Sequence, residues 1–322
     1  MIRSIFALVG CMLFLSACDG LVTEPLPEHT PQLVLNGFFE PDKPMDVYLS
    51  RSYGLLEQID SAAQIMIEDA TVELLEDGQV LAEMIYRDTI IDPFISFARD
   101  RRLGKYSAAG LTAESGKTYT VRATRSGYEP IEASTTIPFP ANVLAVEIDQ
   151  NVARVQEPFQ QTSRSQSIAR ITLADPADIV NYYSFGISIW FFDSAFQSQS
   201  QTEILSIGLA ERSDNGGFES GETIVSDQEF DGETATLEFL IDLPTSWLDR
   251  SEIYELAIDS IVVFSTSSNH DYAQYSIKKR QQAGGLGGFD FFPSESVVVY
   301  DNVEGGFGIL GGFVIRRDKF PG

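Results

Sequence analysis

One cysteine near the start of the chain has a setting suited to covalent chemistry. Cys18 directly follows Leu15, Ser16 and Ala17, which end a short apolar run with a basic residue ahead of it. A basic start, about 7–15 apolar residues and small residues at the end are the parts of a secretory signal peptide. The pattern therefore predicts a signal peptide over residues 1–17 that is removed on export.

The position of this cysteine resembles the lipobox of bacterial lipoproteins, which is cut between Ala17 and Cys18. A transmembrane helix is the alternative, but crossing about 30 Å of hydrocarbon takes roughly 20 apolar residues, and this run is shorter. One acyl chain binds a membrane only reversibly, since each buried methylene contributes about 0.8 kcal/mol. We therefore expect Cys18 to carry several chains, such as palmitate, and to act as a firm lipid anchor.

Few other side chains are suited to chemistry. The only cysteines are Cys11 and Cys18, and Cys11 would leave with the signal peptide, so no disulfide or cysteine zinc site is expected. His29 lies in a proline-rich segment and His270 at a predicted helix start, and neither has a G-x-S-x-G nucleophile motif beside it. We predict no enzymatic activity, no metal and no cofactor. A hydrolase with a carboxylate pair is an alternative, because acidic residues are abundant.

The charge of the chain is strongly acidic. It has 47 Asp and Glu against 22 Lys and Arg, which gives a formal net charge of -25. Such a surface repels nucleic acid and disfavours basic-patch adhesion to anionic lipid. We interpret the acids as solvating side chains. A Ca²⁺ site is the alternative, although no D-x-D-x-D-G loop occurs.

A glycine motif near the end of the chain has the form of a phosphate loop. Residues 306–311 fit G-x-G-x-x-G, but no Lys-Ser or Lys-Thr follows and no βαβ unit surrounds them. Glycine among strand-like residues indicates bulges or close approach of backbones. We therefore predict that these glycines are structural.

The elements that follow the anchor are predominantly β-strands. Residues 18–32 contain Pro25, Pro27 and Pro31 and are predicted to form a semi-stiff, lipidated tether. Short β-prone runs spaced about 8–12 residues apart predict an N-terminal β-sandwich over residues 33–138, of the immunoglobulin or fibronectin kind. Asp77-Gly78, between two alternating runs, predicts a hairpin turn.

Residues 141–322 are predicted to form a second, β-rich, sandwich-like domain. Its polar stretches at 151–168 and 193–224 are expected to be long surface loops. One short helix is predicted near residues 270–282, with Asn269 as its cap. Its apolar face is poor, so we expect it on the outside of the sandwich.

Several short motifs resemble one family of lipoproteins. They occur in the same order over most of the chain and comprise Leu33–Gly37, Val47–Ser52, Asp175-Pro176 with Asn181–Tyr183, Ser226–Gly232 and Asn302–Gly311. With the lipobox, they resemble the DUF4249 family of Bacteroidota outer-membrane lipoproteins. The resemblance implies an outer-membrane protein encoded beside TonB-dependent receptors. It supplies no catalytic residue, because the function of the family is undefined.

These observations together give one leading functional expectation and two alternatives. We expect a lipid-anchored outer-membrane protein, exposed at the cell surface, that serves a TonB-dependent receptor as an accessory binding subunit in nutrient uptake. Its partners would be the membrane, through the lipid on Cys18, and the receptor, with no nucleic acid. The alternatives are an adhesive or structural glycan-binding surface protein and the hydrolase with a carboxylate pair.

Overall fold

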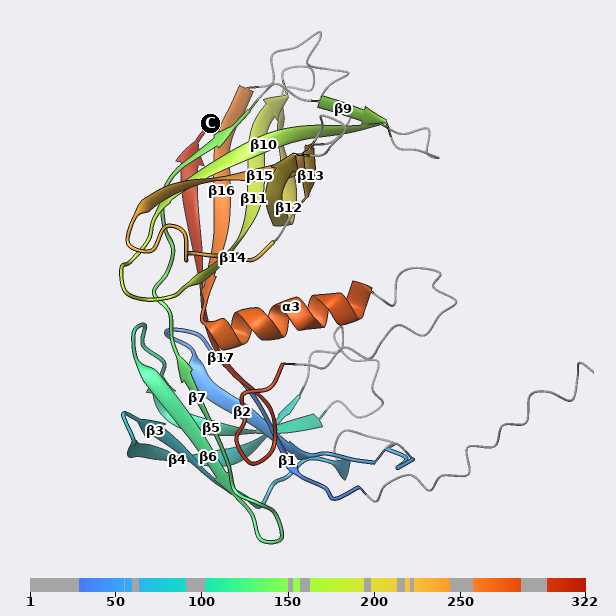
Figure 1. Ribbon diagram of the computed structural model, residues 1–322, viewed down its shortest axis with the longest axis vertical. Helices are drawn as coiled ribbons and strands as arrows, with labels where there is room; N and C mark the ends of the chain where they lie inside the picture. The colour runs from blue at the N-terminus through green and yellow to red at the C-terminus, as the bar shows by residue number, and fades with distance from the viewer. Residues whose placement is uncertain are drawn as a thin grey trace, which may run out of the picture.

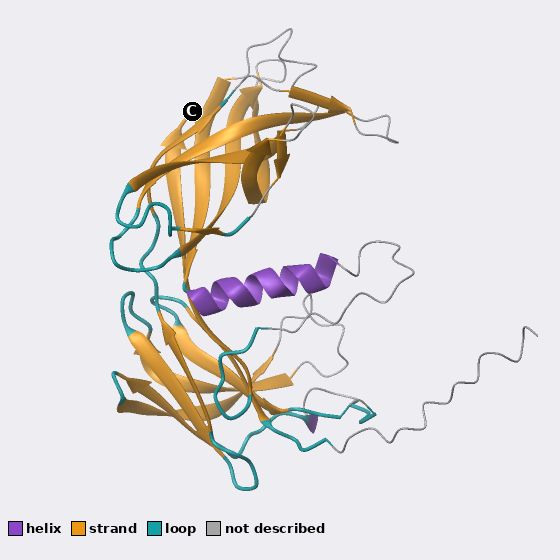
Figure 2. Cartoon of the chain, in the orientation of Figure 1, coloured by secondary structure: helices purple, strands orange, loops and turns teal. Residues whose placement is uncertain are grey.

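The structure is a computed structural model of the 322-residue chain. It is mostly β, with one described α-helix, as the sequence predicts (Figure 2). The residues that the structure describes are 29–54, 56–59, 64–90, 102–149, 153–156, 163–193, 198–212, 218–220, 223–243, 257–284 and 300–322. The predicted signal peptide and most of the tether lie outside these ranges.

The N-terminal half is built from strands that pair in two groups. The first group is β1, β2, β5 and the second part of β4; the other is β3, β6, β7 and the first part of β4. Strand β4 therefore continues from one group into the other. The strands are β1 Leu33–Phe39, β2 Pro44–Arg51, β3 Thr71–Glu76, β4 Gln79–Ile90, β5 Arg102–Thr112, β6 Thr118–Thr124 and β7 Ile131–Thr136.

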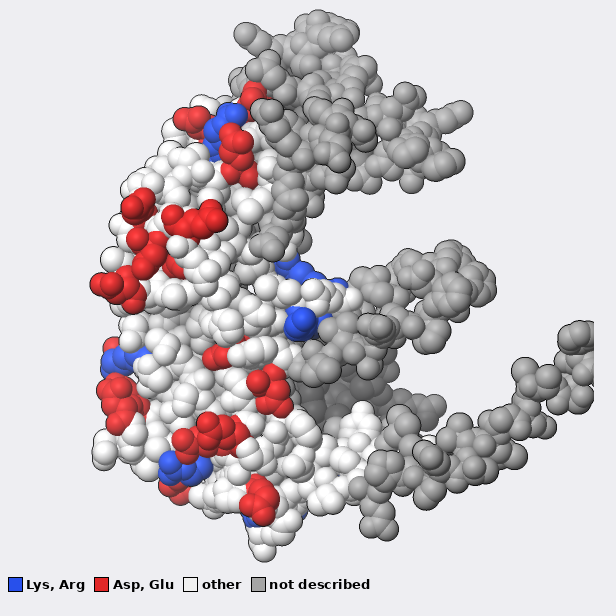
Figure 3. All heavy atoms as spheres, in the orientation of Figure 1, with Lys and Arg blue, Asp and Glu red and all other residues white. Residues whose placement is uncertain are grey.

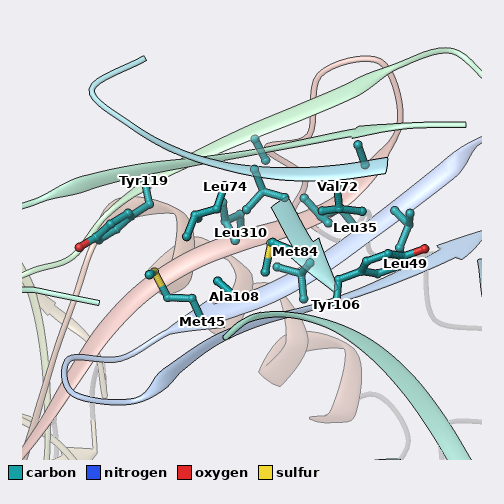
Figure 4. Close-up of a cluster of buried hydrophobic side chains, with 14 of the residues drawn as sticks. Leu35, Met45, Leu49, Val72, Leu74, Met84, Tyr106, Ala108, Tyr119 and Leu310 are labelled. Atoms are coloured by element: carbon teal, nitrogen blue, oxygen red, sulfur yellow. The ribbon is translucent and has the colours of Figure 1, made fainter. Parts of the chain in front are cut away.

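Alternation of apolar and polar residues explains which side chains enter the core of this half. In β1 every second residue is buried, because successive side chains of a strand point to opposite faces. The inward side chains of both groups form one hydrophobic cluster (Figure 4). The predicted hairpin is also present, since Asp77 and Gly78 join β3 to β4 with φ of 50° and 77°.

The C-terminal half has two further groups of paired strands around a second hydrophobic cluster. Strands β8, β9 and β15 pair with β10, and the end of β12 pairs with β15. Strands β12, β14 and β16 pair with β11. The strands are β8 Asn142–Ile148, β9 Ala153–Gln156, β10 Ser163–Ala174, β11 Tyr182–Asp193, β12 Ser198–Arg212, β13 Phe218–Ser220, β14 Val225–Ser226, β15 Thr234–Leu243 and β16 Ala257–Ser268.

The prediction of long surface loops at 151–168 and 193–224 was wrong. Much of the first stretch forms β9 and the start of β10, and much of the second forms β12 and β13. Backbone pairing with β11 along most of β12 holds the polar sequence in a sheet. Polar side chains also pair across strands, as Gln201 Nε2 donates to Ser188 Oγ at 2.7 Å, and Ser188 is fully buried.

The last strand, β17 Phe307–Pro321, belongs to both halves (Figure 1). Its first six residues, 307–312, pair in parallel with β1, and residues 313–321 pair antiparallel with β16. Leu310 and the preceding Val303 accordingly belong to the N-terminal hydrophobic cluster. The end of the chain therefore completes the core that the beginning of the chain starts.

The helix α3, His270–Gly284, confirms the helix predicted near residues 270–282, and it follows the end of β16 directly. Asn269 caps it, because its Oδ1 accepts a hydrogen bond from the Tyr272 backbone N–H at 3.0 Å. The helix does not lie on the outer face of one sandwich. It lies between the two halves (Figure 1), where Tyr272 stacks on Phe313 and packs edge-on against Phe38.

Glycine is required where β1 and β17 lie side by side. Gly308 has a φ of 123°, a region that L-residues with a side chain rarely enter, and a Cβ there would overlap the Leu35 carbonyl oxygen. The G-x-G-x-x-G motif is thus part of a strand pair, and the prediction of structural glycines is confirmed.

Gly308→Ala should lower the free energy of unfolding by at least about 3 kcal/mol, because backbone strain and a forced contact add. Gly110→Ala is the matched control. Gly110 also has a positive φ but has no atom within 4 Å of a Cβ, so only the conformational cost of about 1–2 kcal/mol applies. Urea unfolding measures both. Equal losses in the two variants would contradict the close approach of β1 and β17.

Candidate functional site

The two histidines considered for chemistry from the sequence, His29 and His270, are not brought together. Leu15, Ser16, Ala17 and Cys18 lie outside the described residues, so the structure says nothing of the anchor. The two histidines lie in different environments. His29 precedes β1, and its Nε2 lies 3.1 Å from the Oγ of Ser52, which follows β2. His270 is the first residue of α3, and its Nδ1 lies 2.9 Å from the Tyr182 hydroxyl oxygen.

A cluster of three carboxylates instead forms at one end of the C-terminal half. Asp175 directly follows β10, whereas Asp227 and Asp231 lie between β14 and β15. Strand β10 pairs with β15, and β11 pairs with β14, so the two connecting segments meet at the same end of the sheets. We call Asp175, Asp227 and Asp231 the carboxylate cluster. One oxygen from each lies within 4.8 Å of those from the other two.

Asp175 is held firmly at the base of the cluster. Its Oδ1 accepts a hydrogen bond from the buried Tyr183 hydroxyl, and its Oδ2 accepts one from the Gly232 backbone N–H at 3.0 Å. Its own N–H donates to the Glu233 carbonyl at 3.0 Å. Burial and the Asp175 carboxylate raise the pKa of Tyr183 above its ordinary value, so the tyrosine stays a proton donor.

Asp227 is completely buried and is paired with Asn181, which is also completely buried. The Asn181 N–H donates to Asp227 Oδ2 at 2.6 Å, and the Asp227 N–H donates to the Asn181 carbonyl at 3.1 Å. The remaining oxygens, Oδ1 of Asp227 and Oδ1 of Asn181, have no hydrogen-bond donor among the described residues. Buried polar atoms normally have a partner, so these two oxygens indicate an interaction still to be accounted for.

The carboxylate cluster brings three acidic groups of like charge close together. Burial raises the pKa of Asp227, and the charges of Asp175 and Asp231 add to this, although hydrogen bonding from Asn181 works in the opposite direction. Within the described ranges, no Lys, Arg or His forms an ion pair with these carboxylates. In Figure 3, acidic side chains gather along the left edge of this half. The cluster therefore has a negative charge that no described side chain neutralises.

This arrangement fits cation binding better than hydrolysis. Two carboxylates of a glycosidase must reach a sugar from either side, whereas Asp175 and Asp227 are buried and only Asp231 is exposed. Carboxylate and amide oxygens are the ligands of hard cations such as Ca²⁺. The group does not have the D-x-D-x-D-G pattern of a Ca²⁺ loop, because Asp175 is more than fifty residues away from Asp227 and Asp231 in the sequence.

Comparison with known protein families matches residues 22–318 to DUF4249, a domain of unknown function. The chain is a member of the DUF4249 family. The resemblance drawn from its short motifs is thereby confirmed. Two of those motifs, Asp175 with Asn181–Tyr183 and Ser226–Gly232, supply every residue of the carboxylate cluster and its main hydrogen-bond partners. A search of curated proteins found no match to this DUF4249 protein.

Asp227 should make stability fall as pH rises in buffers without divalent cations. A carboxyl group whose pKa is raised on folding binds its proton more tightly in the folded state. Its contribution is therefore full below the unfolded pKa of about 4 and is lost as pH rises through the higher folded value. Urea unfolding of the wild type and Asp227→Asn should show the wild type losing stability relative to the variant over this interval. A constant or rising difference would contradict the raised pKa.

Proposed function

We propose that this DUF4249 protein is a lipid-anchored binding protein of the outer membrane, exposed at the cell surface. The observation that carries the proposal is the Leu15-Ser16-Ala17-Cys18 motif at the end of an apolar run. A proline-rich tether then leads into β1, so the body would stand away from the lipid at the end of a semi-stiff spacer. Within the described part of the chain, no helix is long and apolar enough to cross a membrane.

We further propose that the protein acts as an accessory subunit of a TonB-dependent receptor in nutrient uptake. Support comes from the family resemblance and from a β-rich body whose two halves share a strand, which suits holding a partner in a fixed geometry. The burial of Asp175 and Asp227 favours a binding role over a hydrolytic one. Adhesive glycan binding at the surface is the competing role, and loss of attachment with normal uptake in a deletion strain would favour it.

Cys18→Ser should move the protein from the membrane fraction to the soluble fraction, because the acylated thiol is lost. Cys11→Ser is the matched control, since Cys11 lies in the segment predicted to be removed. Both are followed by sedimentation and immunoblotting, with mass spectrometry of the N-terminal peptide to detect the acyl chains. A Cys18→Ser protein that still sediments with the membranes would rule out the anchor at this position.

A tagged wild-type chain, solubilised from outer membranes in mild detergent, should bring down a TonB-dependent receptor. Tagged Cys18→Ser, handled in the same way, shows whether anchoring is needed for the association. The pulled-down proteins are identified by mass spectrometry, and growth on limiting nutrient is compared between wild-type and deletion strains. Purification without any such receptor, together with unchanged uptake in the deletion strain, would remove the accessory role.

A further inference from the structure

We propose that the carboxylate cluster, Asp175, Asp227 and Asp231, is a Ca²⁺-binding site, with the side-chain oxygen of Asn181 as a further ligand. The inference is independent of the receptor role proposed above. It is carried by two separate observations. First, three carboxylates converge, and no described Lys, Arg or His forms an ion pair with them. Second, two side-chain oxygens on completely buried residues have no hydrogen-bond donor among the described residues.

The spacing of the carboxylates matches the size of the ion. Ca²⁺ binds oxygen at about 2.3–2.6 Å, so two oxygens on one ion can be up to about 5 Å apart. One oxygen each from Asp175, Asp227 and Asp231 lies within 4.8 Å of the others. The three carboxylates therefore lie close enough together for one Ca²⁺ to draw a ligand from each. Mg²⁺ binds at about 2.0–2.1 Å in a stricter octahedron, which requires a tighter group.

The free lone pairs point to a cation rather than to another hydrogen-bond donor. Asp227 Oδ2 is occupied by the Asn181 N–H, which leaves Oδ1 of Asp227 for a further partner. The Asn181 side chain donates its Nδ2 to the Ile179 carbonyl at 2.9 Å, so its Oδ1 is the atom left unused. The atoms left without a hydrogen-bond partner in these two residues are therefore both acceptors, Oδ1 of Asp227 and Oδ1 of Asn181.

The chemistry of the ligands selects a hard cation. All the candidate ligands are oxygens, and the described cluster contains neither histidine nor cysteine, the ligands that favour zinc or copper. The rigid part of the site is Asp175, held by the Tyr183 hydroxyl and the Gly232 N–H. Asp231 is exposed and supplies the side from which an ion and its water ligands enter.

A bound Ca²⁺ would join the two segments that connect β10 to β11 and β14 to β15. It would neutralise the negative charge of the cluster and would give the two buried oxygens a partner. Extracellular Ca²⁺ modules bind with dissociation constants of about 10⁻⁴–10⁻³ M, and we expect this site to fall in or near that range.

Isothermal titration and thermal unfolding of the detergent-purified full chain, freed of metal with a chelator, test the site with CaCl₂. We expect one Ca²⁺ per chain, and an unfolding midpoint that rises by about 4 °C at a hundredfold excess over the dissociation constant. MgCl₂ at equal concentration should give a smaller rise. The proposal would be overturned if the wild type bound no Ca²⁺, or if its unfolding midpoint did not change with Ca²⁺. A larger response to Mg²⁺ would overturn the choice of ion.

Asp231→Asn tests the ligands without disturbing the core, because Asp231 is exposed. We expect it to weaken Ca²⁺ binding by about tenfold or more. Glu229→Gln is the matched control, an exposed acid in the same segment but outside the cluster, and it should bind as the wild type does. Wild-type affinity in Asp231→Asn would overturn the assignment.

Asp227→Asn should bind no Ca²⁺ and should be at least as stable as the wild type without Ca²⁺, because a buried charge is removed.

Discussion

Strand β17 forms backbone hydrogen bonds with both halves of the molecule, and this sharing constrains the rest of the structure. Residues 307–312 must lie against β1 closely enough to pair in parallel, and residues 313–321 must continue directly into the ladder with β16. Gly308 makes the first contact possible. Because a strand within two ladders cannot slide in one without breaking the other, the register of each half limits that of its neighbour.

The same constraint places α3. The helix leaves the end of β16, and Asn269 bonds not only to the first turn of the helix but also to the Gly312 N–H on β17 and the Thr135 hydroxyl on β7. One side chain therefore links the helix start, the shared strand and the N-terminal half. Phe38, Tyr272 and Phe313 pack around this point and fill the region where the two halves meet.

Local patterns in the sequence predicted much of this fold, and long-range pairing explains what they missed. Asp77-Gly78 specified its hairpin and Asn269 its helix cap, because both signals act within a few residues. The polar stretch that became β12 has no such local signal, and it becomes a strand through pairing with β11. The carboxylate cluster was hidden for a similar reason. Its motifs were visible as separate family signatures, but only the β10–β15 and β11–β14 pairings bring Asp175 to Asp227 and Asp231.

The position of β1 has a mechanical consequence for a protein that would be held by its N-terminus. Strand β1 is the first described strand after the predicted tether, and β17 runs beside it in the same direction towards the C-terminal half. Tension between the N-terminus and a load on the C-terminal half would therefore act along these strands. The hydrogen bonds of the β1–β17 ladder would resist it in shear, all together, instead of opening one after another. The parallel pairing of β1 with β17 would thus also make an N-terminal attachment resistant to pulling.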